Sequence, residues 1–259
     1  AVHDLKSHNR VERIWPQKHI VKTESTPIIL ASDRHVEETI TPETVSYLNE
    51  YNPTIAKQRA TLFAQNGLKL IQWLGRETKI KDVVLWLWGD FISWHIHDEL
   101  KEENAMSPME AIRYSKWLLR GTIDHYIENS DYNINIITNF GNHGRNTKRM
   151  SHGDHAWKHS FEYHLYLDLA DIYQDNSRVK FKIEKWYFNY LPIYNKLIRF
   201  HHWHNLKYQG GVGWLYIPVN KAIAQRNKWR YADLDVFAHW HQLIDGGNFV
   251  GNGSLIGYW

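Results

Sequence analysis

The sequence predicts an α/β fold in which buried strands alternate with helices. Short apolar runs at residues 27–31, 82–88 and 134–140 are typical of strands that are covered on both faces. Between these runs lie longer segments whose apolar residues recur at helical spacing. The order strand, helix, strand is that of a βαβ unit, and 259 residues are enough for one large domain of this kind.

The first half of the chain shows this alternation clearly. Residues 1–26 are polar without a clear period, so we expect an irregular N-terminal arm before a single domain at residues 27–259. Thr41-Pro42-Glu43 carries the proline of a helix start. The expected elements are, in order, a strand at residues 27–31, a helix at 55–74 and a strand at 82–88.

The second half adds further helices, and after residue 176 the pattern changes to strands in which apolar and polar residues alternate. Ser107-Pro108-Met109-Glu110 has the capping residues of a helix start, and that helix should run to about residue 128. We expect Pro192 to separate two alternating strands. The expected elements are, in order, a strand at 134–140, a helix at 155–173, strands at 179–183 and 194–201, a helix at 218–227 and a strand at 235–241.

The composition excludes several classes of chemistry. The chain has no cysteine, so disulfides, thiolate metal sites and cysteine nucleophiles are ruled out. No apolar stretch approaches the roughly 18 residues of a membrane span, and the N-terminus lacks the apolar core of a signal peptide. We therefore expect a cytoplasmic protein without a membrane partner. The net charge of +3 permits a nucleic-acid partner and does not require one.

Polar residues follow five of the apolar runs directly. Successive tips are between about 35 and 60 residues apart, which leaves room for one strand-helix-strand unit between them. Because ligands bind at the carboxyl ends of parallel strands, these tips could meet at one edge of a sheet sandwich. The tip residues are Asp33 and His35, Asp90, Asn142 and His143, His202, and His239 and His241.

Imidazole, carboxylate and carboxamide groups without thiolates are a ligand set for divalent cations such as Mn²⁺, Fe²⁺ or Zn²⁺. Two such ions close together suit hydrolytic attack on phosphorus. Asp90 is central in the order of the tips, so it is the candidate to bridge both ions. Taken alone, the stretch from Ile136 to Arg145 is equally typical of a strand followed by an ordinary turn.

The tips belong to five short motifs that occur in order over residues 33–241. They are Asp33-x-His35, Gly89-Asp90, Gly141-Asn142-His143, His202 and Ala238-His239-x-His241. This series resembles the calcineurin-like metallophosphoesterase superfamily. The resemblance implies a four-layer α/β/β/α sandwich with a dinuclear metal centre, and we expect Mn²⁺ in it, with Fe²⁺ or Zn²⁺ as alternatives.

The resemblance also implies a role for each tip residue. One ion would be held by Asp33, His35, Asp90 and His241. The other would be held by Asp90, Asn142, His202 and His239. His143 would act on the phosphate or the leaving group without binding metal, so His143 and Asp90 are the expected catalytic residues.

Three positions depart from the family pattern. Gly144 stands where the family usually has an acidic residue that orients the histidine, and Asp98 or Asp154 could take over that task. Trp203 follows His202 where the family usually has glycine, so the neighbouring His201 and His204 compete for the role of ligand. Ala238 stands where the family's fifth motif usually begins with glycine.

Residues beside the tips suggest the substrate. Arg145 and Arg149 follow the third motif, where they would meet a phosphate or a nucleic-acid backbone, although a solvated basic loop has the same composition. Trp203 and Trp240 follow proposed ligands, so they either stack a base or pack beneath the site.

We therefore expect a phosphodiesterase that acts on DNA or RNA, in the manner of the family's nuclease branch. The alternatives are a phosphomonoesterase acting on a protein or nucleotide, and a nucleic-acid-binding or assembly protein with a weakened metal centre.

Overall fold

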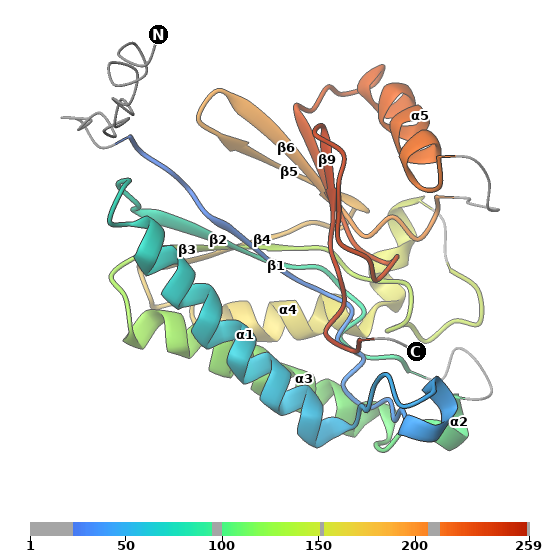
Figure 1. Ribbon diagram of the computed structural model, residues 1–259. Coiled ribbons are helices and arrows are strands. Elements are labelled where there is room, and N and C mark those ends of the chain that lie inside the picture. The colour runs from blue at the N-terminus through green and yellow to red at the C-terminus, as the bar shows by residue number, and fades with distance from the viewer. Residues whose placement is uncertain (1–22, 95–99, 151–152, 207–212, 258–259) are drawn as a thin grey trace, which may run out of the picture.

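The computed structural model describes residues 23–94, 100–150, 153–206 and 213–257, which form two β-sheets (Figure 1). The first sheet is parallel with strand order β1-β2-β3-β4, and the second is mixed with order β5-β6-β7-β9-β8. The strands are β1 (Ile28–Ala31), β2 (Asp82–Leu87), β3 (Asn133–Thr138), β4 (Val179–Ile183), β5 (Phe188–Ile193), β6 (Lys196–His201), β7 (Leu234–Phe237), β8 (Ile244–Asp245) and β9 (Phe249–Gly251).

Helices cover the outer faces of both sheets. In Figure 1, α1, α3 and α4 lie below the first sheet and α5 lies to the right of the second, which gives the order helix, sheet, sheet, helix. The α/β class is therefore confirmed. The helices are α1 (Pro53–Leu74), α2 (Leu100–Glu103), α3 (Pro108–Glu128), α4 (Phe161–Ile172) and α5 (Tyr216–Asn227), with 3-10 turns at Pro42–Val45 and Gly153–His159.

The long helices begin where the sequence supplies caps. The side chain of Asn52 accepts a hydrogen bond from the N–H of Ile55, and Pro53 occupies the first turn of α1. Ser107 and Glu110 form a complete capping box at the start of α3. These caps fix the direction of α1 and α3 after β1 and β2, so that each helix returns the chain for the next parallel strand.

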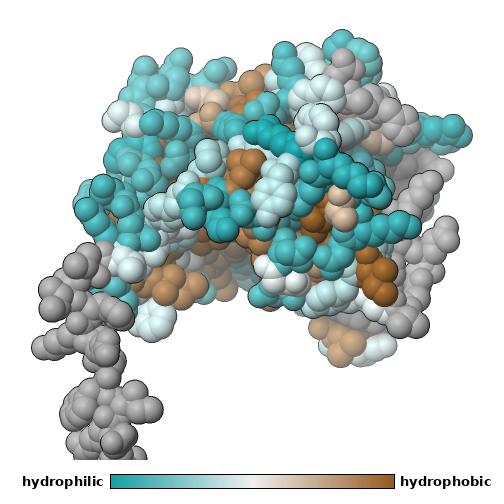
Figure 2. Space-filling view, turned by 90° about the horizontal axis from the view of Figure 1, so that it is seen from above, coloured by the Kyte–Doolittle hydropathy of each residue, from teal (hydrophilic) through white to brown (hydrophobic). Residues whose placement is uncertain are grey.

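Aromatic residues fill the space between the two sheets. The rings of Trp86 and Phe200 lie 4.5 Å apart, and the indole N–H of Trp88 donates to the carbonyl of His201 over 2.8 Å. These contacts join β2 to β6, so they fix how the two sheets face each other. On the face shown in Figure 2, hydrophobic residues reach the surface as separate patches among hydrophilic ones.

Several expected elements differ from the observed ones. Pro192 lies inside β5 instead of separating strands, which is compatible with the position of β5 at the edge of its sheet. The helix expected at 155–173 begins only at Phe161, because Ser160 caps it by accepting from the N–H of Tyr163. The expected helix start at Thr41 gives one 3-10 turn.

The ends of the chain are described in part. Residues 1–22 of the expected N-terminal arm lie outside the described residues, whereas Glu24 forms a β-bridge with Lys79. Among the helices that the structure describes, none is both long and apolar enough to cross a membrane.

Candidate metal centre

The loops that follow β1, β2, β3, β6 and β7 converge at one edge of the two sheets. The N–H of Asp33 donates to the carbonyl of Gly89 over 3.0 Å, and the N–H of His35 donates to the carbonyl of Asp90 over 3.1 Å. Six of the seven expected ligands gather in two groups that could each hold a metal ion. Within each group one ligand atom per residue lies within 4.8 Å of the others, and the groups are Asp33, His35 and His241, and Asp90, His202 and His239.

Two glycines allow the loops to come this close. Gly89 has a positive φ of 81°, and a Cβ atom there would lie 2.1 Å from the amide nitrogen of Gly141. A Cβ atom on Gly141 would lie 1.9 Å from Oδ1 of Asp90. Any side chain at either position would therefore push apart the second and third motifs.

Five of the candidate ligands have left-handed backbone conformations. Their φ angles lie between 44° and 81°, a region that residues other than glycine rarely adopt. Such conformations persist only where the surrounding structure imposes them, and they cluster at functional sites. These residues are Asp33, His35, Asp90, His239 and His241.

The group around Asp90 is held together by direct contacts between its own members. Oδ2 of Asp90 lies 2.7 Å from Nε2 of His202, and Oδ1 of Asn142 lies 3.1 Å from the same nitrogen. Nδ1 of His202 lies 2.9 Å from the carbonyl oxygen of Trp88, which can only accept a hydrogen bond. Nδ1 therefore carries a proton, and Nε2 points towards Asp90 and Asn142, the seventh expected ligand.

The group around Asp33 is looser and is supported from outside. Nε2 of His241 lies 3.4 Å from Oδ1 of Asp33. Nδ1 of His35 lies 2.7 Å from the hydroxyl of Ser93, which also contacts the carboxylate of Glu38. Within the described part of the chain, Nε2 of His35 is buried without a hydrogen-bond partner, as expected for a nitrogen that binds metal.

The protonation of the two groups follows from burial and from charge. Burial opposes charge on both members of the Asp90–His202 pair, yet their attraction holds the pKa of Asp90 well below its usual value and raises the pKa of His202 to about 9. Burial and the neighbouring His143 hold the pKa of His35 well below its usual range. Burial and His202 lower the pKa of His239 to about 4, so this ring is neutral near pH 7, the form that binds metal.

His143 has a partner that the sequence did not reveal. Its Nδ1 lies 3.1 Å from the carbonyl oxygen of Ser93, and its backbone N–H donates to Oδ1 of Asp90 over 2.9 Å. The ring lies 4.9 Å from that of His35. A backbone carbonyl thus orients His143, and no acidic residue at position 144 is needed for that task.

Glu162 explains why position 144 is glycine. A Cβ atom on Gly144 would lie 3.0 Å from Cγ of Glu162 and 3.2 Å from Cγ1 of Ile92. The buried carboxylate of Glu162 accepts from the N–H groups of Phe91 and Gly141 over 2.7 and 2.8 Å, so it joins the second and third motifs. The sequence offers Asp98 and Asp154 in place of the acidic residue expected at position 144. Asp98 and the side chain of Asp154 lie outside the described residues.

The histidines beside His202 have other positions. His201 points to the opposite face of its strand, where its Nε2 lies 3.0 Å from Asp235, so it does not compete for the metal group. The ring of His204 lies 6.0 Å from that of His202 and 5.0 Å from that of Tyr187. His202 is therefore the member of this cluster that joins Asp90.

The residues expected to bind substrate fall into two kinds. The guanidinium of Arg145 donates to the carbonyls of its own loop, whereas Arg149 is exposed. Trp203 is only 2% exposed and packs against Phe237, which favours packing beneath the site over stacking on a base, the two alternatives expected for it. Trp240 is half-buried with its ring 5.3 Å from that of His239.

No protein-family model matches this chain, and no curated protein matches it. The geometry of the site is therefore what indicates the function of the chain. Its donor set consists of imidazole nitrogens, carboxylates and one carboxamide oxygen, which suits borderline divalent cations.

Proposed function

We propose that the protein is a two-metal phosphoesterase of the calcineurin-like metallophosphoesterase superfamily that hydrolyses phosphodiesters in nucleic acid. The observation that carries this proposal is the convergence of two Asp/His groups, from four separate loops, at one edge of the sandwich. Structural metal sites rarely need two adjacent groups, whereas two-metal hydrolases use such a pair.

In this proposal each of the two groups of candidate ligands holds one ion. Asp33, His35 and His241 would hold one ion, and His202, His239 and Asn142 would hold the other, with Asp90 between them. Two ions bound there, which we propose to be Mn²⁺, would activate a water molecule and neutralise charge on the phosphate.

His143 supplies the proton chemistry in this proposal. Its Nδ1 donates to the carbonyl of Ser93, and in this proposal its Nε2 acts on a phosphate oxygen or the leaving group. The hydrogen bond from its backbone to Asp90 places it beside the ligands without making it one. The exposed side chains of Lys148 and Arg149 follow in the same loop and support a polyanionic substrate.

Hydrolysis of a simple aryl phosphodiester and of the matching phosphomonoester in Mn²⁺ tests this function. We expect the diester to be the better substrate, and we expect His143→Ala and Asp90→Asn to lower its hydrolysis by roughly 10²–10⁴-fold. His164→Ala, an exposed histidine of α4, is the control and should leave the rate unchanged.

Metal analysis of the purified chain complements the rates. We expect about two ions per chain in the wild type and fewer in Asp90→Asn. Faster hydrolysis of the monoester than of the diester would indicate a phosphomonoesterase in place of a phosphodiesterase. A chain with far fewer than two ions and no activity in Mn²⁺ would indicate a binding protein instead.

A further inference from the structure

A pocket lies at the edge of the sandwich, and none of its lining residues is a candidate metal ligand. It has a volume of about 320 Å³, close to the lower limit of about 300 Å³ for small-molecule sites. Three regions supply its walls, namely the edge strand β4, the edge strand β5 with the connection before it, and the segment after α5. Its lining residues are Lys182, Glu184, Trp186, Phe188, Tyr190, Trp229 and Arg230.

Four of the seven lining residues are aromatic, and two of them face solvent. Trp186 is 55% exposed and Trp229 is 77% exposed, although large aromatic side chains are normally buried. The guanidinium of Arg230 lies 3.9 Å from the centre of the Tyr190 ring. Exposed indoles beside a stacked guanidinium form a surface on which another flat ring can stack.

The charges of the pocket favour an anionic ligand. Lys182 and Arg230 carry positive charge, and Glu184 is the single carboxylate among the lining residues. A sugar would instead need several amide, hydroxyl or carboxylate groups to bind its hydroxyls, and the lining contains only Glu184 and the phenol of Tyr190. A nucleobase joined to phosphate matches both the aromatic rings and the cations.

The pocket and the metal centre share one segment of chain. Phe188 of the pocket pairs with His201, the residue before the candidate ligand His202. Between Trp186 and Phe188, Tyr187 turns its ring to within 5.0 Å of His204, and its carbonyl accepts from the side chain of Asn139 over 3.1 Å. Residues 186–188 therefore form a wall of the pocket and also contact residues next to the metal groups.

We propose that this pocket binds a nucleobase of a single-stranded nucleic acid whose backbone runs to the metal centre. The proposal rests on the proposed phosphodiesterase function and names its substrate class. Trp186 and Trp229 supply the stacking surfaces, and Lys182 and Arg230 attract the phosphates on either side of the base.

Binding of a fluorescent single-stranded oligonucleotide, followed by anisotropy in the Asp90→Asn background, tests the pocket without cleavage. We expect Trp186→Ala and Trp229→Ala each to weaken binding by roughly 5- to 100-fold. An oligonucleotide that lacks bases should bind the parent weakly and should lose little more in these variants.

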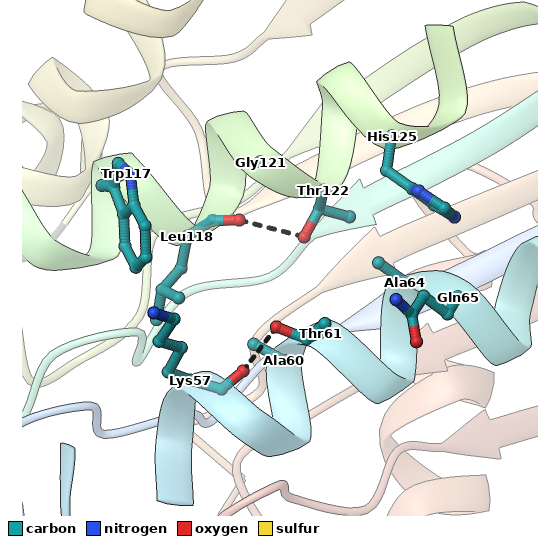
Figure 3. A pocket seen from close by; sticks show the side chains of 10 residues that line it. All are labelled: Lys57, Ala60, Thr61, Ala64, Gln65, Trp117, Leu118, Gly121, Thr122 and His125. Carbon is teal, nitrogen blue, oxygen red and sulfur yellow. Dashed lines mark hydrogen bonds between the residues drawn. The ribbon is translucent and has the colours of Figure 1, made fainter. Parts of the chain in front are cut away.

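Trp117→Ala is the matched control. Trp117 is 52% exposed in a groove of about 280 Å³ between α1 and α3, with Nζ of Lys57 5.0 Å from its ring centre, and none of the residues that line this groove is a candidate metal ligand (Figure 3). It offers an exposed indole beside a cation at another place. Its replacement should leave oligonucleotide binding unchanged.

Three results would overturn the proposal. The first is unchanged binding in both pocket variants, and the second is an equal loss in Trp117→Ala. The third is displacement of the oligonucleotide by a neutral oligosaccharide, which would assign the pocket to sugars. The metal content of Trp186→Ala and Trp229→Ala should equal that of the parent, so a failure of the pocket is distinguishable from a failure of the metal centre.

Discussion

The two halves of the candidate metal centre are held in place by different means. In the half around Asp90, the candidate ligands contact each other directly, with 2.7 Å between Asp90 and His202. In the half around Asp33, the nearest pair is 3.4 Å apart, and His35 is positioned by Ser93. The Asp90 half is stabilised by a buried ion pair. The Asp33 half depends on residues that are not candidate ligands, such as Ser93.

This difference matters most when the metal is removed. Without metal, the Asp90 half keeps a charge-compensated pair, whereas the Asp33 half relies on the loop from Phe91 to Trp94. That loop is fixed by Glu37, whose Oε1 accepts from the N–H groups of Ser93 and Trp94 over 2.7 and 2.9 Å. Substitutions in the two halves should therefore have unequal effects on the metal-free protein.

The largest contrast is expected between His202→Ala and His35→Ala. His202→Ala leaves the buried Asp90 carboxylate without its partner, so we expect it to lower the free energy of unfolding of the metal-free protein by about 3–5 kcal/mol. His35→Ala removes a neutral ring with one hydrogen bond, and we expect a loss of about 1–2 kcal/mol. Urea denaturation in the presence of a chelator measures both, and equal losses would remove the distinction between the two halves.

The second contrast concerns pH and Glu37. Burial raises the pKa of Glu37 to about 7 from its ordinary value of 4.5, so the folded protein binds this proton more tightly than the unfolded chain does. The stability from this group is fully present below pH 4.5 and is lost as the pH rises to about 7, by an amount on the order of 3 kcal/mol.

Glu37→Gln tests this dependence, because its amide oxygen can still accept both backbone hydrogen bonds. We expect the variant to lack this component of the pH dependence, so that it gains stability relative to the wild type between pH 4.5 and 7. Denaturation of the metal-free proteins across this range gives the comparison, with the exposed Glu128→Gln as control. Parallel curves for wild type and Glu37→Gln would show that Glu37 is ionised throughout.

The smallest effect is expected from Ser93→Ala. This variant compares the two halves by their affinity for Mn²⁺. Loss of the hydroxyl that orients His35 should weaken Mn²⁺ binding at the Asp33 half by roughly 10- to 100-fold and leave the other half unchanged. Calorimetric titration should resolve the two affinities. Ser115→Ala is the control, because Ser115 is equally buried and donates to the carbonyl of Phe91 without touching a ligand. A uniform loss at both sites would show that Ser93 supports the whole loop.

Much of the first sheet could be predicted from the sequence. β1, β2 and β3 coincide with the expected apolar runs to within two residues at either end, because strands covered on both faces consist largely of apolar residues. β4 coincides with the alternating strand expected at residues 179–183. The gathering of Asp33, Asp90 and the histidines was also expected, since the carboxyl ends of parallel strands share one edge of a sheet.

The residues that support the site could not be predicted in the same way. Ser93, Glu37 and Glu162 lie far in sequence from the groups that they hold, and isolated polar residues carry no periodic signal. The sequence does not predict β5, because Pro192 argues against a strand. This holds for central strands, whereas β5 is an edge strand, in which proline is tolerated. Trp203 could not be assigned to the core or the surface until the second sheet was in place.

The left-handed backbone at Asp33, His35, Asp90, His239 and His241 has a practical consequence for protein engineering. Each such residue costs the fold about 1–2 kcal/mol relative to glycine in the same conformation. Replacing one of these residues by glycine would relieve the backbone strain, but it would also remove a candidate metal ligand and, at Asp90, the partner of the buried His202. Thermostability and metal binding therefore cannot be improved together at these five positions.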